Sequence, residues 1–440
     1  MNTLITDDAA AARVPIEITF RGSSGPMIGL GFINGVLKVL TLGLYSFWAK
    51  TEVRRRIWSA TRLNGEPITY TGTGKELLLG FLIVFGAVVL PALFGGIAVS
   101  LVFSGNPQAF AVYQGVLYIA FFILFGNALY RAQRYRLSRT EWRGIRGGMV
   151  GSPGQYSWAY FWTLAAPIVA IAILAGGIAY ATGPAVGGVI MMLGLLTVLW
   201  VLPWRANYLQ SLMTRDMRFG DRPLSYTGTA PPLYRRYLFA WLGNAMIFGA
   251  AVTATALYVL QSGIYERQLA GIRPGPWDYL PIAGIWIVAL IASAVVTSWY
   301  RASQINHFAR HTHFEGATFR ADASGSTLMW LVLSNWLISI AGILAGVMIG
   351  GLLVYLLAPP GPAGDPASYT PNSLVALFVV PPIIVMTTLA ATLAQFRAAR
   401  YLLSRLKLDG PVNLATILQS QSNKPKRGEG LAQVFDIDAF

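Results

Sequence analysis

Eight long segments of this sequence contain no charged residue, and each is long enough to cross the hydrocarbon core of a bilayer as a helix. Only 12% of the 440 residues are charged, about half of the share in soluble domains, and the mean hydropathy is +0.54. We therefore predict an all-α polytopic membrane protein. The eight segments lie near 77–102, 112–130, 158–181, 184–204, 237–260, 279–300, 328–357 and 373–396.

The basic residues between these segments predict the orientation of the chain. Net charge is +15, and 28 of the 33 Lys and Arg residues fall in five stretches, which are 50–75, 131–157, 205–236, 301–327 and the tail from 397. Lys and Arg beside membrane spans stay on the cytoplasmic side. We therefore expect these connectors and the C-terminus in the cytoplasm, and the lipid bilayer, including anionic lipids, as the partner of the basic charge rather than nucleic acid.

The connectors also repeat. An aromatic residue followed closely by a basic one ends each pair of spans, and a glycine follows 13 to 15 residues after the basic residue. The glycines are Gly65, Gly144, Gly220, Gly316 and Gly410. After two of them the chain shares the pattern P-x-x-Y-T-G-T, at Pro67–Thr73 and Pro223–Thr229. These features predict four repeated transmembrane hairpins, eight spans in all, with short cytoplasmic β-strands after the glycines.

The N-terminal part of the chain admits two interpretations. Residues 1–15 are predicted to be a polar tail, and Ile16–Phe20 alternates as a short strand does. The glycine-rich apolar segment 28–48 then either enters the membrane and returns on the same side or forms a ninth span with the N-terminus outside.

The repeat divides the chain into four regions. Residues 1–65 hold the N-terminal strand, the 28–48 segment and the first basic connector. Residues 66–219 and 220–409 each hold a pair of helical hairpins, and residues 410–440 form a cytoplasmic C-terminal tail. Capping-box spacing predicts helix starts at Thr73 with Glu76 and at Ser152 with Gln155.

A small set of polar residues in or near the apolar segments forms a candidate polar path: Asn34, Lys38, Asn127, Asn244 and Asn335. The alternative is that the amides bond neighbouring helices and that the lysine reaches the membrane interface. No acidic residue falls inside a span, which argues against proton coupling through a membrane carboxylate.

The basic connectors supply candidate contacts to anionic head groups: Arg54, Arg55, Arg56, Arg131, Arg134, Arg205, Arg301 and Arg397. Arginine binds phosphate well, and basic clusters beside spans attract anionic lipid. The alternative is that these residues only hold the connectors in the cytoplasm.

Catalytic and metal motifs are weak. The sequence has no cysteine, and its three histidines form H-x-x-x-H-x-H-x-E from His307 to Glu315 without the H-E-x-x-H arrangement. Gly72–Lys75 lacks the spacing of a phosphate-binding loop. We therefore predict no catalytic residue, no metal site and no cofactor, and a protein that is not an enzyme.

One family likeness rests on four short stretches. F-R-G at 20–22, the segment from Asn34 to Trp48, the arginines at 54–56 and Y-T-G-T-G-K-E at 70–76 resemble the YjgN-like family of bacterial inner-membrane proteins. The family is a domain of unknown function. The resemblance implies a multi-pass protein of the bacterial inner membrane and supplies no substrate.

Two functions remain open from the sequence. The helical bundle transports a solute or handles lipid, or it is a membrane scaffold whose cytoplasmic face docks a protein or anionic lipid.

Reporter fusions at residues 140 and 220 test the predicted topology. Both positions lie in basic connectors, so we expect a reporter that works only in the cytoplasm to be active at both. A fusion at residue 270, in the opposite loop, is the control and should be inactive. Opposite behaviour of the fusions at 140 and 220 would contradict the repeat.

Overall fold

The computed structural model describes residues 13–357, 372–422 and 425, and helices dominate it. In chain order the helical elements are α2 (Gly25–Leu40), α3 (Ser46–Ala60), α4 (Gly74–Val84), the π-helical turn η1 (Phe85–Val89), α5 (Leu90–Val102), α6 (Pro107–Ser138), α7 (Pro153–Thr182), α8 (Pro184–Val198), the 3₁₀ turn η2 (Leu199–Val201), α9 (Leu202–Asp216), α10 (Pro231–Gln261), α11 (Ile264–Leu269), the 3₁₀ turn η3 (Pro276–Tyr279), α12 (Leu280–Arg310), α13 (Gly325–Leu357) and α14 (Asn372–Leu403).

Short strands lie between the helices. They are β1 (Arg13–Pro15), β2 (Ile18–Phe20), β3 (Thr61–Leu63), β4 (Glu66–Pro67), β5 (Thr69–Tyr70), β6 (Thr140–Trp142), β7 (Ile145–Met149), β8 (Met217–Phe219), β9 (Arg222–Tyr226), β10 (Thr312–Phe314), β11 (Ala317–Ala321), β12 (Leu406–Asp409) and β13 (Pro411–Asn413).

Within the described residues, eight helices are long and apolar enough to cross a membrane, and each of the eight predicted segments lies in one of them. The prediction of eight apolar helices of membrane-spanning length is therefore confirmed. Several helices continue past the apolar segment into the basic connector, as α6 does to Ser138 and α12 does to Arg310. Charge ends the apolar run, but it does not end a helix, because Arg and Gln are good helix formers.

The five glycines lie between two strands, not before a single one. Gly65, Gly144, Gly220, Gly316 and Gly410 all have positive φ angles, from 61° to 119°. Three of them follow a non-glycine residue that is also left-handed, at Asn64, Arg143 and Glu315. Two consecutive residues with positive φ form the turn that best joins two twisted antiparallel strands. The prediction of a strand only after each glycine is therefore incomplete, because a strand also precedes each glycine, and the strands on either side of the first four glycines pair as β-hairpins.

The strands pair in sequence order. β5 to β12 form one antiparallel sheet in which each strand pairs with the next, and β2, β3 and β4 form a second sheet. The two sheets adjoin, because the amide of Ile68, between β4 and β5, donates to the Thr61 carbonyl at 3.0 Å. At the other end β2 lies beside β12. The strand layer therefore curves almost into a closed ring.

The interior of this ring is apolar. Phe314, Leu408 and Val412 are buried in a cluster with Ile16, and Phe219 packs against them. A cavity of about 230 Å³ remains at the centre, and residues of both sheets line it. Inward-facing side chains from every side of the layer thus form one common core.

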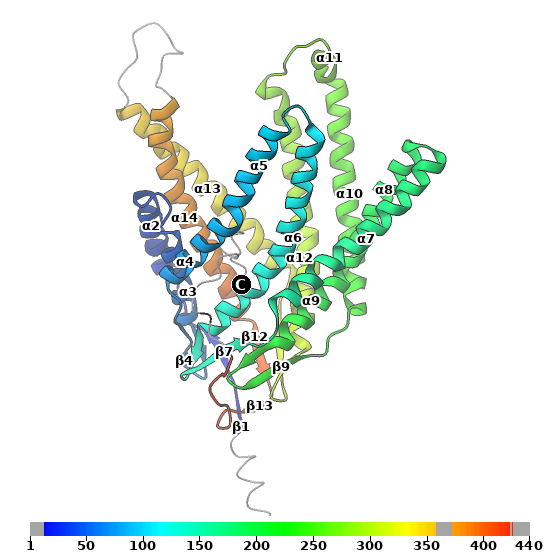
Figure 1. Ribbon diagram of the computed structural model, residues 1–440. Helices are drawn as coiled ribbons and strands as arrows, with labels where there is room; N and C mark the ends of the chain where they lie inside the picture. The colour runs from blue at the N-terminus through cyan, green and yellow to red at the C-terminus, as the bar shows by residue number, and fades with distance from the viewer. Residues whose placement is uncertain (1–12, 358–371, 423–424, 426–440) are drawn as a thin grey trace, which may run out of the picture.

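The helices rise from one side of this layer and diverge from it (Figure 1). Successive helices contact one another around the molecule: α3 with α4, α5 with α6, α6 with α7, α7 with α8 and α9, α9 with α10, α10 with α12, α12 with α13, and α13 with α14. The last contact returns to the beginning, because α14 packs along α2.

Segment 28–48 is not one continuous helix. α2 ends at Leu40, the chain turns through 41–45, and α3 runs back to β3. β2, before α2, pairs with β3, after α3, so the chain leaves and returns to the same strand layer. α2 has 16 residues, about 24 Å of helix at 1.5 Å per residue, which is less than the roughly 30 Å of hydrocarbon. This is the geometry of the re-entrant alternative.

Both ends of the described chain join the strand layer. Residues 13–15 form β1 and pair with β13, so the predicted polar tail holds a strand at its end, and residues 1–12 of that tail lie outside the described residues. After β13 the chain runs along the layer, where the Leu418 amide donates to Asp221 Oδ1 at 2.9 Å and Arg146 donates to the Ser420 carbonyl. The four predicted regions stay a prediction, and their boundaries after residues 65, 219 and 409 each fall between two consecutive strands.

The two predicted capping boxes differ. Thr73 Oγ1 accepts from the Glu76 amide and Glu76 Oε2 accepts from the Thr73 amide, so this box is confirmed. The box at Ser152 is wrong, because the Ser152 side chain makes no capping hydrogen bond. Pro153 at the first helical position starts α7 instead, since its fixed φ suits a helix and it has no amide donor to satisfy.

Two glycines of α2 test the α2–α14 contact. A Cβ at Gly35 would lie 2.7 Å from the Val385 Cα, whereas a Cβ at Gly29 would meet nothing within 4 Å. Gly35→Val should therefore destabilise the protein by roughly 1–3 kcal/mol or more through overpacking. Gly29→Val carries the same change in helix propensity and is the control. Equal thermal midpoints for the two variants in detergent would contradict the packing.

Candidate functional site

A cavity with both polar and apolar walls lies where the α2–α3 hairpin meets α14 and α4. Its volume is about 560 Å³. It is lined by Lys38, Leu42, Gly43, Leu44, Ser46, Phe47, Ala49, Lys50, Val53, Phe81, Thr388, Ala391, Thr392 and Gln395. We call it the lysine groove.

Two cations from different helices line the lysine groove. Lys38 comes from the last turn of α2, and Lys50 comes from the first half of α3. Among the described residues that line the groove, none is acidic. The described wall of the groove therefore contributes two positive charges to one cavity.

α14 contributes the uncharged polar wall. Thr388, Thr392 and Gln395 follow one another at helical spacing, so they share the face that meets the hairpin. Thr388 and Thr392 are buried. The Thr392 hydroxyl donates to the Thr388 carbonyl at 2.8 Å, so its oxygen keeps its capacity to accept a hydrogen bond.

The backbone turn at 41–45 brings the two lysines to one cavity. The Gly43 amide donates to the Lys38 carbonyl at 2.7 Å, which ends α2. Leu42 and Gly43 both have positive φ angles, 51° and 91°. Thr41 Oγ1 then accepts from the Tyr45 amide at 2.9 Å, just before α3 begins. A non-glycine residue such as Leu42 rarely adopts this conformation, so the reversal is specified by its surroundings.

The structure places only two of the five candidate path residues together. Asn34 is four residues before Lys38 on α2 and is 1% exposed, and its Nδ2 has no hydrogen-bond partner among the described residues. Its buried amide thus lies directly below the lysine groove along α2.

The other three asparagines occupy separate helices. Asn244 on α10 donates to the Ala240 carbonyl at 2.7 Å and accepts from Ser293 of α12, so it bonds that helix pair. Asn335 on α13 lies 3.5 Å from the Ala394 carbonyl of α14. Asn127 on α6 has a buried Oδ1 without a partner in the described part of the chain. A path through all five residues stays a prediction.

Two of the candidate head-group arginines join neighbouring helices. Arg205 donates to Thr163 Oγ1 at 3.1 Å and to the Tyr160 carbonyl at 3.0 Å, and its guanidinium lies 4.2 Å from the Tyr160 ring centroid. Arg397 donates to Ser334 Oγ at 2.7 Å. These contacts fix α9 to α7 and α14 to α13.

The remaining candidate arginines divide between buried and exposed positions. Arg54 is buried, 3.5 Å from Tyr70 Oη, and Arg55 donates to Glu52 at 2.8 Å. Arg301 donates to Gln304 at 3.3 Å. Exposed guanidiniums are found at Arg56 and Arg131, and Arg134 is half-buried.

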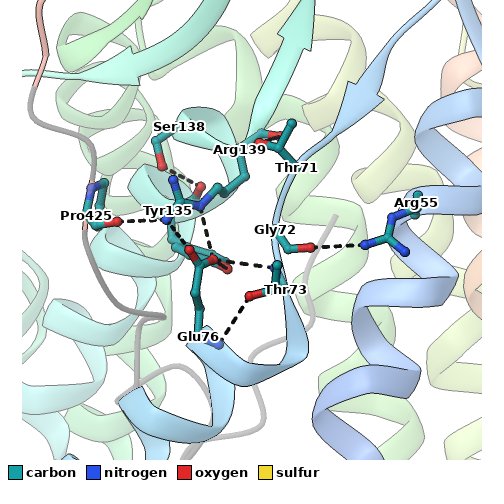
Figure 2. Close-up of polar contacts among 9 residues, drawn as sticks. All are labelled: Arg55, Thr71, Gly72, Thr73, Glu76, Tyr135, Ser138, Arg139 and Pro425. Atoms are coloured by element: carbon teal, nitrogen blue, oxygen red, sulfur yellow. Dashed lines mark hydrogen bonds and ion pairs between the residues drawn. The ribbon is translucent and has the colours of Figure 1, made fainter.

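A second polar cluster joins the start of α4 to the end of α6 (Figure 2). Arg139 donates to both carboxylate oxygens of Glu76, at 2.6 and 3.2 Å, and Tyr135 Oη donates to Glu76 at 2.7 Å. Arg139 also donates to the Pro425 carbonyl at 2.9 Å. The sequence signalled Glu76 only through its capping box. Its bidentate pairing with an arginine 63 residues away was missed because nothing local marks it.

The histidines and the Gly72 turn have structural contacts. The rings of His307 and His311 lie 4.3 Å apart, and His313 lies between Thr227 and Thr318. No group of three or more His, Cys, Asp or Glu residues suitable for a metal is found among the described residues. At Gly72 a Cβ would lie 2.6 Å from the Tyr70 ring, so glycine is required for that ring to cover the turn.

Eight apolar helices joined by strand hairpins define the chain as a multi-pass integral membrane protein. It belongs to the family described as "Bacterial protein of unknown function (DUF898)", whose model matches residues 15–434. It is 24% identical over 353 residues to the inner membrane protein YjgN of Salmonella typhimurium. The aligned residues make up 78% of this chain and 86% of that protein. The YjgN-like resemblance and the inner membrane location are thereby confirmed. No solved structure matches the chain.

Removal of the Arg139 side chain tests the second cluster. Arg139 is 5% and Glu76 25% exposed, so Arg139→Ala leaves a partly buried carboxylate unpaired. A fully buried pair costs roughly 3–5 kcal/mol to break, and we expect a loss near the lower end. Arg143→Ala breaks an exposed pair, in which Arg143 holds the pKa of Glu66 below its usual value, and is the control. Thermal midpoints that fall equally would contradict a stabilising role specific to Arg139.

Proposed function

We propose that the strand layer faces the cytoplasm and that four repeated helical hairpins cross the membrane from it. The hairpins are α4–α6, α7–α9, α10–α12 and α13–α14. The support is the charge distribution, since the strand hairpins lie in the stretches that hold 28 of the 33 basic residues. In this orientation the described end of the chain at Pro425 is cytoplasmic.

In this orientation the α2–α3 hairpin enters the bilayer from the cytoplasm and returns. The tip of the hairpin supports this proposal, because Leu40, Leu42 and Leu44 are 72%, 95% and 57% exposed. Exposed leucines at a tight turn are costly in water and favourable in hydrocarbon. The hairpin then inserts its apolar tip between the long helices, with α14 beside it.

The proposed function is the binding and movement of an anionic lipid, with its head group held in the lysine groove. One observation carries it: two lysines from different helices, Lys38 and Lys50, line one cavity together with threonine hydroxyls and apolar side chains. Lys38 lies about 20 Å along α2 from its start, at 1.5 Å per residue. An anionic ligand at such depth attracts a cation more strongly than it does in water, because the surroundings are less polar.

The surroundings of the groove suit an amphiphile better than a small polar anion. Leu42, Leu44 and Phe81 line the same cavity as the lysines, and the two leucines are largely exposed. A phosphate or carboxylate can therefore contact the lysines and Thr392 while an acyl chain stays in hydrocarbon. A solute without an apolar part would leave these side chains against water.

A lipid-movement assay tests the proposal. Purified protein is placed in vesicles containing fluorescent phosphatidylglycerol, and movement between leaflets is measured by chemical quenching. Lys38→Ala with Lys50→Ala should slow movement by about tenfold or more, because each cation near an anionic lipid contributes roughly 1 kcal/mol. Lys38→Arg should retain activity, since it keeps the charge.

Lys75→Ala is the matched control, because Lys75 is an exposed lysine outside the groove. It should move lipid at the rate of the unchanged protein. Absence of lipid movement with the unchanged protein, or full activity of the double variant, would overturn the proposal. The docking of a partner on the strand layer would then be the better account.

A further inference from the structure

A second cavity lies between α10 and α12, away from the lysine groove in sequence and made by different helices. Its volume is about 710 Å³. It is lined by Arg235, Arg236, Phe239, Ala240, Gly243, Val295, Val296, Trp299 and Tyr300. Within the part of the chain that the structure describes, this lining includes no acidic residue.

One end of this cavity is cationic. Arg235 and Arg236 are exposed and lie within the first two turns of α10, close to the strand layer. In the residues that the structure describes, no hydrogen bond or ion pair is found for either guanidinium, whereas Arg205 and Arg397 are bonded to neighbouring helices. Two adjacent guanidiniums in one cavity suit a phosphate, which accepts paired hydrogen bonds from arginine.

The rest of the cavity is apolar and extends along the helices. Phe239 and Gly243 follow Arg236 at intervals of three and four residues, so they continue the same face of α10 for about 10 Å. Val295 and Val296 form the facing wall on α12, and a Cβ at Gly243 would lie 2.9 Å from Val296 Cγ1. Gly243 thus marks a close approach of α10 and α12 within the cavity wall.

Charged and apolar parts of the cavity follow one another along the spans in the same order as the head group and acyl chains of a lipid in a bilayer. The cations lie at the end near the strand layer, and the apolar walls lie farther along the spans. Trp299 lies beside the arginines at 49% exposure, and tryptophan favours the membrane interface. Phe239 is 67% exposed, which leaves a large apolar surface for an acyl chain.

We propose that this cavity binds one anionic glycerophospholipid, with its phosphate at Arg235 and Arg236 and an acyl chain along Phe239, Val295 and Val296. The site is independent of the lysine groove. The head-group arginines expected from the sequence were those that end spans, and Arg235 and Arg236 were missed because they begin one.

Titration with lipid tests the site. Purified protein in detergent is titrated with short-chain phosphatidylglycerol and with short-chain phosphatidylcholine, and bound lipid is counted by native mass spectrometry. The experiment is done in the Lys38→Ala, Lys50→Ala background, so that failure of the lysine groove does not affect the result. Arg235→Gln with Arg236→Gln should weaken phosphatidylglycerol binding by about 30-fold, from two cations near an anionic lipid.

Arg215→Gln with Arg310→Gln is the charge-matched control, because both residues are exposed and neither lines the cavity. It should bind phosphatidylglycerol as the background protein does. An equal loss in both double variants would show attraction by net charge alone and would overturn the site. Equal affinity of the background protein for the two lipids would also overturn it.

A variant without charge change separates a lipid from a free phosphate. Val295→Trp fills the apolar wall and leaves both arginines in place. It should weaken phosphatidylglycerol binding while leaving the weak binding of glycerol 3-phosphate unchanged. Unchanged lipid binding by Val295→Trp, with an unaltered thermal midpoint, would mean that the acyl chain does not lie there and would overturn the proposal.

Discussion

Backbone hydrogen bonding between successive connectors determines where the helices stand. Each strand hairpin has two edges, and an unpaired edge leaves amides and carbonyls unsatisfied. Here each edge pairs with the hairpin that precedes or follows it in sequence, from β5 through β12, and β2 lies beside β12 at the end of the series. Because every hairpin joins one descending helix to one ascending helix, this order of pairing also sets the order of the helices around the molecule.

The sequence predicted the spans well and the strand layer only in part. A span needs about 20 apolar residues, and that signal depends on no distant contact. The strands before the glycines were missed because they are three or four residues long and polar, as in Thr140–Trp142. Their stability comes from partners in another connector, and a local pattern does not encode a partner. Of the lysine groove, the sequence identified Lys38, because it is a charged residue in an apolar segment. It did not identify Lys50 and Thr392, because only the turn at 41–45 and the packing of α14 bring them to the same cavity.

Contacts divide the many basic residues into two kinds. Arg139, Arg205 and Arg397 are bonded to neighbouring elements, and their charge is used to fasten helices together. Two further pairs of cations, Lys38 with Lys50 and Arg235 with Arg236, each line one cavity, and the described lining residues of both cavities include no acidic side chain. Composition and net charge could not separate these kinds, because both satisfy the rule that keeps cations beside spans on one side. Whether a cation bonds a neighbouring helix or lines a cavity depends on which helix packs against it.

The short α2–α3 pair explains why the lysine groove lies where it does. α2 occupies a place in the circle of helices between α14 and α3, and glycines let it lie close to α14. Its 16 residues end well before those of the 32-residue α14, so the neighbouring long helix continues past the tip without α2 beside it. Because the α2–α3 pair is short, a space remains beside α14 at the tip of the pair. Lys38, Lys50 and Thr392 line this space. Lengthening α2 to span the membrane would close the opening and bury the lysines, which gives a physical reason for a pair that enters and returns.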